Sequence, residues 1–91
     1  MIKISDNEIY SNGVKIGWIE GNDVKDHEGH KLGYFNDNDI LNASGIKMGY
    51  TQGGELIMNN GKIITFENLR NHIQGSVNDI ARAAIYVFFG G

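Results

Sequence analysis

The chain contains no cysteine and no proline among its 91 residues. A domain this small has a thin core, and without cysteine it cannot be reinforced by disulfides. Reinforcement must then come from closing a ring of strands, from a covering C-terminal segment, or from self-association. The absence of cysteine is typical of a reducing compartment. The absence of proline suits β-hairpins, because every backbone N–H in a hairpin ladder is needed as a donor.

Long hydrophobic runs and an excess of positive charge are also absent. The longest apolar run, at 83–89, is far shorter than the roughly 20 residues of a membrane-spanning helix. The first six residues contain no stretch of signal-peptide character. We therefore expect no membrane span and a cytoplasmic protein as written, or an exported one if a signal peptide was removed. The net charge of −3, with acids and bases interspersed, argues against nucleic acid as a partner.

The chain does contain a repeat with a period of 16 residues. The segments at 13–18, 29–34 and 45–50 read GVKIGW, GHKLGY and GIKMGY, and a fourth copy at 61–66 reads GKIITF. A fixed short period indicates one supersecondary unit copied in tandem. Each unit reads as a short strand, a glycine turn, a longer strand and a polar turn, which predicts four β-hairpins. The structural glycines of the repeat are Gly13, Gly29, Gly45 and Gly61 at the turns and Gly17, Gly33 and Gly49 in the longer strands.

Alternation along the longer strands divides each of them into two faces. We expect the face that carries Val14, Ile16 and Trp18, with its equivalents in the other units, to be buried. The opposite face carries a lysine and a glycine, Lys15 and Gly17 in the first unit. A glycine there allows a bulky group, such as an aromatic ring from a neighbouring unit, to come close.

The last quarter of the chain departs from the repeat. Residues 67–75 predict a loop with one more short strand near Ile73. Residues 76–89 predict an apolar helix with Ser76 as N-cap and Asp79 in its first turn. The alternative is a helix that ends at Ala84 and continues as a strand over 85–89, because these residues are good β-formers. The prediction is a single domain over 1–91: all-β with a C-terminal helix, four hairpin repeats over 1–66 in a pseudo-fourfold closed arrangement.

The repeat and the ending together resemble a known family. The run IYSNGVKIGW at 9–18, its copies, and AAIYVFF at 83–89 are similar to the β-flower proteins, which are uncharacterised bacterial proteins. The resemblance covers nearly the whole chain and implies hairpin petals around a pseudo-symmetry axis, four here, or five if 67–75 is counted. The fourth copy departs from it, with Ile63 in place of lysine and Thr65 in place of glycine. The resemblance implies no activity and no catalytic residues.

Four aromatic residues occupy equivalent places in the repeat: Trp18, Tyr34, Tyr50 and Phe66. Symmetry would place them in a ring. Such a ring is either the core of the domain or a platform for sugars or quaternary amines. Both interpretations remain open at this point, with the core favoured because large aromatic side chains dominate the cores of small domains.

Two other groups are candidate binding sites. His27 and His30 lie beside Asp26 and Glu28 in one predicted hairpin tip, where they are a weak candidate for a metal site. One tip rarely supplies the three or four converging ligands that a metal needs, so a polar turn is favoured. The repeated lysines, Lys15, Lys31 and Lys47, would bind an anion on the axis or simply remain solvated.

Catalytic motifs are missing from the sequence. It has no cysteine nucleophile, no Gly-x-Ser-x-Gly elbow and no phosphate-binding glycine loop. We therefore expect a non-enzymatic hairpin module without a cofactor, with a structural or protein-interaction role, in which self-association or a protein partner is expected. The alternative is a small-ligand binder that uses the repeated aromatics.

Overall fold

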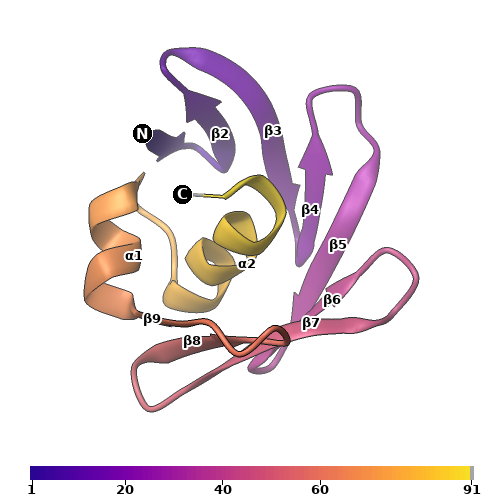
Figure 1. Ribbon diagram of the computed structural model, residues 1–91. Helices are drawn as coiled ribbons and strands as arrows, with labels where there is room; N and C mark the ends of the chain where they lie inside the picture. The colour runs from indigo at the N-terminus through magenta and orange to yellow at the C-terminus, as the bar shows by residue number, and fades with distance from the viewer. Residues whose placement is uncertain (91) are drawn as a thin grey trace.

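The computed structural model describes residues 1–90, and Gly91, the last residue of the expected domain, lies outside them. The described chain forms a ten-stranded sheet and two helices, and Figure 1 shows the sheet curving around the helix α2. The strands are β1 (Ile2–Ser5), β2 (Glu8–Ser11), β3 (Val14–Glu20), β4 (Asp23–Asp26), β5 (Lys31–Asn36), β6 (Asp39–Asn42), β7 (Lys47–Gln52), β8 (Glu55–Met58), β9 (Ile63–Thr65) and β10 (Ile73–Gly75). The helices are α1 (Phe66–His72) and α2 (Asp79–Phe89). The all-β prediction with a C-terminal helix is confirmed.

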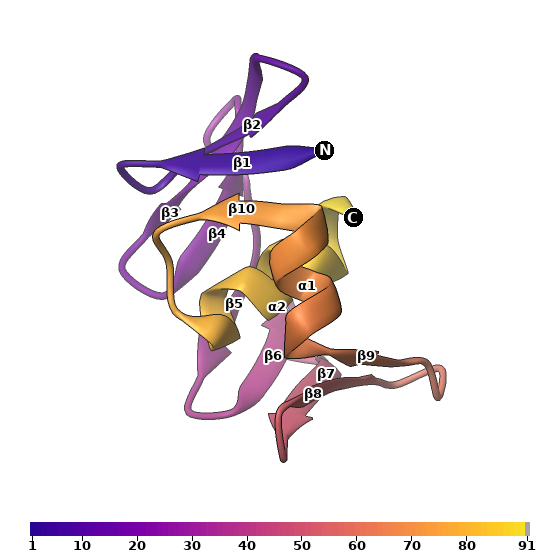
Figure 2. The same ribbon diagram turned by 90° about the vertical axis from the view of Figure 1, so that its left-hand side faces the viewer.

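The sheet is not closed. Strands β1 to β9 follow one another as an antiparallel meander, and β10 pairs in parallel with β1, so that β9 and β10 form the two edges. Figure 2 shows α1 lying between these edges. The helix begins directly after β9 and ends directly before β10, and it contacts both strands and α2. The helix α1 therefore occupies the gap between β9 and β10. The predicted closed arrangement would have left no such gap between two strands.

The loop predicted over 67–75 contains α1 and β10 instead. Thr65 is the N-cap, and its side chain accepts a hydrogen bond from the Asn68 N–H. Glu67 lies in the first turn and basic residues lie in the last, which suits the helix dipole. Leu69 is fully buried and anchors the helix to the core. The short strand expected near Ile73 is present as β10.

The predicted hairpins are present, and their turns repeat in detail. The four turn glycines all have φ between 82° and 91°, a conformation that favours glycine. A β-bulge interrupts the register in each of the first three units, between Ile9/Tyr10, Val24/Lys25 and Ile40/Leu41. These bulges insert one unpaired residue into each longer strand.

The bulge reverses the predicted faces of the longer strands for the residues beyond it, whereas Ile16 packs against the core as predicted. Gly17 and Ile19 are buried beneath the sheet, whereas Val14 is 65% exposed and Trp18 is only half-buried. Strict alternation from the turn predicted the opposite, because it did not allow for the extra residue of the bulge. The glycine faces therefore point toward the core, and three of the repeated aromatics, Trp18, Tyr34 and Tyr50, lie on the outer face of the sheet.

The helix α2 fills the concave side of the sheet. Its N-cap is Asn78, not Ser76 as predicted, and the Asn78 side chain accepts a hydrogen bond from the Ala81 N–H at 2.9 Å. The helix continues to Phe89, so 85–89 is helical and not a strand. Buried alanines and Ile85 pack against the strand residues that start each unit, Ile9, Val24, Ile40 and Leu56. No helix within residues 1–90 is long and apolar enough to cross a bilayer.

The phenylalanines at the end of α2 explain two of the three glycines of the longer strands, Gly17 and Gly33. A Cβ atom built at Gly33 would collide with the Phe88 ring and with the Leu41 carbonyl oxygen. A Cβ at Gly17 would lie 2.9 Å from Phe89 Cζ and would collide with the Lys25 carbonyl oxygen. The bulky group expected beside these glycines is therefore a ring from α2, not one from a neighbouring hairpin.

A buried arginine secures the edge strand β10. Arg82 of α2 is 7% exposed. Its guanidinium group donates to the carbonyl oxygens of Ile73 at 2.9 Å and Gly75 at 2.6 Å, and to Asp79 Oδ1 at 3.2 Å. The strand β10 pairs with β1 alone, so no further strand donates hydrogen bonds to its backbone carbonyl oxygens. The hydrogen bonds from Arg82 take the place of those from a strand.

Candidate functional site

The outer face of the sheet carries a recurring group of a lysine, an aromatic ring and an acid. The lysine Nζ lies over the ring of the aromatic residue three positions later in the same strand. The distances to the ring centroid are 5.2 Å for Lys15 and Trp18, 4.5 Å for Lys31 and Tyr34, and 4.7 Å for Lys47 and Tyr50. The same lysines form ion pairs with Glu8, Asp23 and Asp39 at 2.7, 3.3 and 3.1 Å. Each lysine therefore covers a ring and neutralises an acid, which leaves little of its charge for an axial anion.

Two of the repeated aromatics also touch the turn of the next unit. A Cβ at Gly29 would lie 3.5 Å from Trp18 Cη2, and a Cβ at Gly45 would lie 3.7 Å from the Tyr34 hydroxyl. The ring of one hairpin therefore rests on the turn glycine of the following hairpin. These contacts connect neighbouring hairpins along the outside of the sheet.

The structure does not bring the four predicted aromatics into one ring. Trp18, Tyr34 and Tyr50 lie on β3, β5 and β7, and an intervening strand separates each from the next. Phe66 is the first residue of α1 and packs against the hydrophobic core. A shared cage for one ligand would need rings that face one another. Of the four, Trp18 borders a hollow of about 260 Å³, which Asp6, Glu8 and Lys15 also line.

Two acids of this outer face, Glu8 and Glu20, have a lowered pKa. The pKa of Glu8 is lowered, first by a hydrogen bond from Lys15 and then by one from the Tyr10 hydroxyl. The pKa of Glu20 is lowered chiefly by its hydrogen bond from Lys25, with a smaller effect of the Trp18 indole. A lowered pKa opposes general acid catalysis at neutral pH, because that role requires a protonated carboxyl.

The two histidines lie in the exposed turn between β4 and β5. His30 Nδ1 is 3.2 Å from Asp26 Oδ2, and the His30 side chain is 72% exposed. The pKa of Asp26 is lowered, mainly because the backbone N–H of His30 donates to it. Asp26 also accepts from the Glu28 N–H, so the carboxylate holds the turn together. Within residues 1–90, no three His, Cys, Asp or Glu side chains are gathered in a way that would hold a metal ion.

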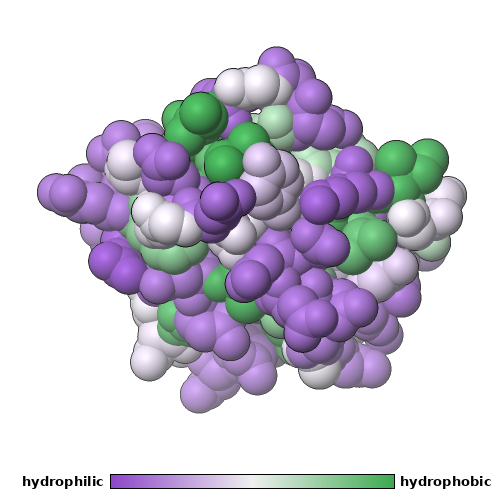
Figure 3. Space-filling view, turned by 90° about the horizontal axis from the view of Figure 1, so that it is seen from below, coloured by the Kyte–Doolittle hydropathy of each residue, from purple (hydrophilic) through white to green (hydrophobic). Residues whose placement is uncertain are grey.

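Exposed apolar side chains mark the ends of several hairpins. Val14, Ile46 and Ile63 are 65%, 60% and 56% exposed. Figure 3, which looks onto the side where β8 and β9 lie, shows hydrophobic residues as small patches among hydrophilic ones. Strict alternation assigned Val14 and Ile46 to the core, but both precede the bulge, beside the turn, and take no part in the core. The exposure of Ile63 could have been inferred from the sequence, because Ile63 stands at the position of the repeated lysine.

A second hollow lies beside the first hairpin and was not anticipated from the sequence. It has a volume of about 510 Å³ and is lined by Met1, Lys3, Tyr10, Asn12 and Gly13. Lys3 precedes the first repeat glycine, so the repeat gave no reason to single it out.

Comparisons of the chain with models of protein families, with curated proteins and with solved structures found no match in any of the three.

Proposed function

We propose that this protein is a non-enzymatic hairpin module that makes protein–protein contacts through the ends of its hairpins. The resemblance to the β-flower family supports a petal-like arrangement of four approximately equivalent hairpins. In such a module α2 holds the hairpins from within, and the turns between strands are free to vary. A repeated scaffold of this kind presents corresponding surfaces side by side.

The observation that carries this proposal is the exposure of Val14 and Ile46 at corresponding positions of two hairpins. Each directly follows a turn glycine. The charged residues nearby are largely paired within the module, as the lysine ion pairs illustrate. The apolar C-terminal segment is occupied inside the sheet, so a partner would meet the hairpin ends instead. Exposed apolar groups rimmed by polar residues are typical of interaction surfaces.

A photo-cross-linking experiment tests the proposal. A benzophenone amino acid replaces Ile46 in the full chain, and in a matched variant it replaces Gln52, which is exposed at the opposite end of β7. On irradiation in cells we expect one adduct of discrete mass from position 46 and none from position 52. An adduct of twice the chain mass would identify a second copy as the partner. Equal labelling from both positions, or none, would contradict the proposal.

A second candidate function is small-ligand binding at Trp18. Its half-buried indole borders the hollow lined by Asp6 and Glu8, and acids beside an aromatic ring suit a quaternary amine. A ligand cation would have to displace the Lys15 ammonium from the ring. If this function holds, titration with choline will change Trp18 fluorescence in a saturable manner, and Lys15→Gln will strengthen the response. An indole that does not respond in either protein would remove this candidate.

A further inference from the structure

The repeated aromatic residues occupy corresponding positions on the outer face of the sheet. The residue of β1 at the corresponding position is Lys3. Lys3 pairs with Tyr10 in the β1–β2 ladder, in the same way that Trp18 pairs with Lys25 in the β3–β4 ladder. The later pairs in this series are Tyr34 with Leu41 and Tyr50 with Ile57. Position 3 is therefore the place at which each later unit carries an aromatic ring.

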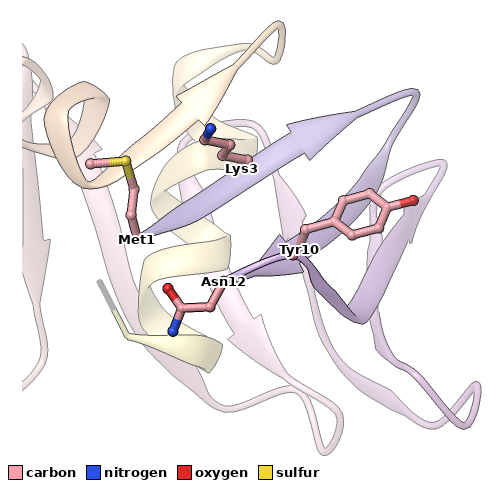
Figure 4. Close-up of a pocket in the computed structure, with 5 residues that line it drawn as sticks. Met1, Lys3, Tyr10 and Asn12 are labelled. Atoms are coloured by element: carbon pink, nitrogen blue, oxygen red, sulfur yellow. The ribbon is translucent and has the colours of Figure 1, made fainter.

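The hollow beside the first hairpin lies where that ring would be. In the next two units the ring rests against a turn glycine, Trp18 against Gly29 and Tyr34 against Gly45. At Gly13, the turn glycine that follows Lys3, a Cβ would meet nothing within 4 Å. Lys3 and Gly13 both line the hollow, and Figure 4 shows the side chains of Met1, Lys3, Tyr10 and Asn12 around it. At Gly61, the turn glycine that follows Tyr50, a Cβ would also meet nothing within 4 Å. The first unit is therefore distinguished by Lys3, which stands beside the hollow where the later units carry a ring.

The charge of Lys3 distinguishes this space further. Within residues 1–90, every other lysine has a charged or phenolic partner. Lys15, Lys25, Lys31 and Lys47 pair with acids at 2.7 to 3.3 Å, and Lys62 Nζ donates to the Tyr86 hydroxyl at 2.8 Å. No such partner of Lys3 is found in this part of the chain. Its ammonium group is therefore available to an anion that enters the hollow.

The other residues that line the hollow suit a flat apolar group of a ligand. The Tyr10 side chain is half-buried, and its hydroxyl donates to Glu8 Oε1 at 2.9 Å, so this polar group is already satisfied. The flexible Met1 side chain adapts to the shape of what it contacts. The Asn12 amide adds a donor at the rim. A volume of about 510 Å³ lies within the range of small-molecule sites.

We propose that this hollow binds an aromatic carboxylate, with its ring over Gly13 and its carboxylate paired with Lys3. The ring replaces the one that the later units supply from their own strands. Neutral aromatic compounds lack the ion pair, and small inorganic anions lack the apolar contact, so both bind less well. This site adjoins the hairpin end at Val14, because both include the turn at Gly13, but ligand binding in the hollow does not depend on the protein contacts proposed there.

The first test compares two probes that differ in charge but hardly in shape, 2-naphthoate and 2-naphthamide. Each is titrated into ¹⁵N-labelled full-length protein. We expect 2-naphthoate to shift the amide signals of Lys3, Tyr10, Asn12 and Gly13 along one saturable curve. The neutral amide should bind roughly threefold to tenfold more weakly, the effect expected of one partly exposed ion pair. Shifts that map to another surface, equal affinity of the two probes, or no shift would overturn the proposal.

The second test fills the hollow from within. Lys3→Tyr restores the aromatic residue of the later units, and we expect it to abolish 2-naphthoate binding and raise the Tm by several degrees. Lys3→Gln keeps the hollow but should weaken binding about as much as removing the charge of the probe. Lys31→Gln, at a lysine paired with Asp23 on another hairpin, is the matched control and should bind normally. Unchanged binding by folded Lys3→Tyr would overturn the proposal, and Lys3→Gln provides the answer if that variant does not fold.

Discussion

Replacing Gly33 with valine is expected to destabilise the fold by about 3 kcal/mol, near the upper end of the effects of overpacking. A side chain at this position would collide with the Phe88 ring of α2 and with the Leu41 carbonyl oxygen of β6. The ring could rotate away, but the carbonyl belongs to a paired strand and cannot move without breaking its ladder. Urea denaturation followed by circular dichroism measures the loss, and the Tm should fall by more than about 10 °C.

Two matched substitutions separate this collision from the general effect of valine in a strand. Asn36→Val lies at the exposed end of the same strand and should change stability by less than about 0.5 kcal/mol. Gly49→Ala should fall between the two, because its Cβ would lie 2.9 Å from the Ile57 carbonyl oxygen and meets no phenylalanine. If Gly33→Val were as mild as Asn36→Val, the contact between α2 and this glycine would not exist in solution.

Replacing Arg82 with methionine is expected to cost about 3 kcal/mol and to loosen β10 before the rest of the sheet. Methionine retains the packing of the side-chain stem but removes the donors for the Ile73 and Gly75 carbonyls. Hydrogen bonds from a charged donor contribute about 1.5–3 kcal/mol each, and losing one partner of a buried group is expensive. Urea denaturation gives the stability, and amide hydrogen exchange should show faster exchange in β1 and β10 than in β5.

Arg82→Lys distinguishes loss of charge from loss of geometry. Lysine keeps the positive charge but lacks the planar fork that reaches two carbonyls at once, so its stability should lie between those of the wild type and Arg82→Met. Asp79→Asn removes the acid from the pair but leaves both bonds to β10, and it should cost less than Arg82→Met. Uniform exchange across the sheet in Arg82→Met would contradict a specific role for Arg82 at β10.

The sequence predicted the repeat and its hairpins because the turn glycines and their neighbours have strong local preferences. The C-terminal helix was predicted for the same reason, since its apolar stripe has a regular period. The faces of the longer strands were predicted wrongly, because a β-bulge shifts the alternation and leaves no distinct mark in the sequence. Gly17 and Gly33 were recognised as sites of close approach, but the rings that approach them belong to Phe89 and Phe88, more than fifty positions away.

Features that depend on distant contacts were the least predictable. The helix α1 was expected to be a loop, because its seven residues carry only one fully buried side chain, Leu69. Its place is determined by the two sheet edges that it contacts. The hollow at Lys3 was not predicted from the sequence. It lies where the first unit has Lys3 in place of the aromatic residue of the later units. Its recognition required the β1–β2 register, which places Lys3 at the position of Trp18.

The parallel pairing of β1 with β10 has a consequence for the order of folding. Every other pairing joins strands that are adjacent in sequence, whereas this one joins Ile2 to Ile73. Forming it requires almost the whole chain to close into one loop, and that entropic cost precedes any gain from the contact. We therefore expect the local hairpins to form first and the two ends of the chain to join in a later step.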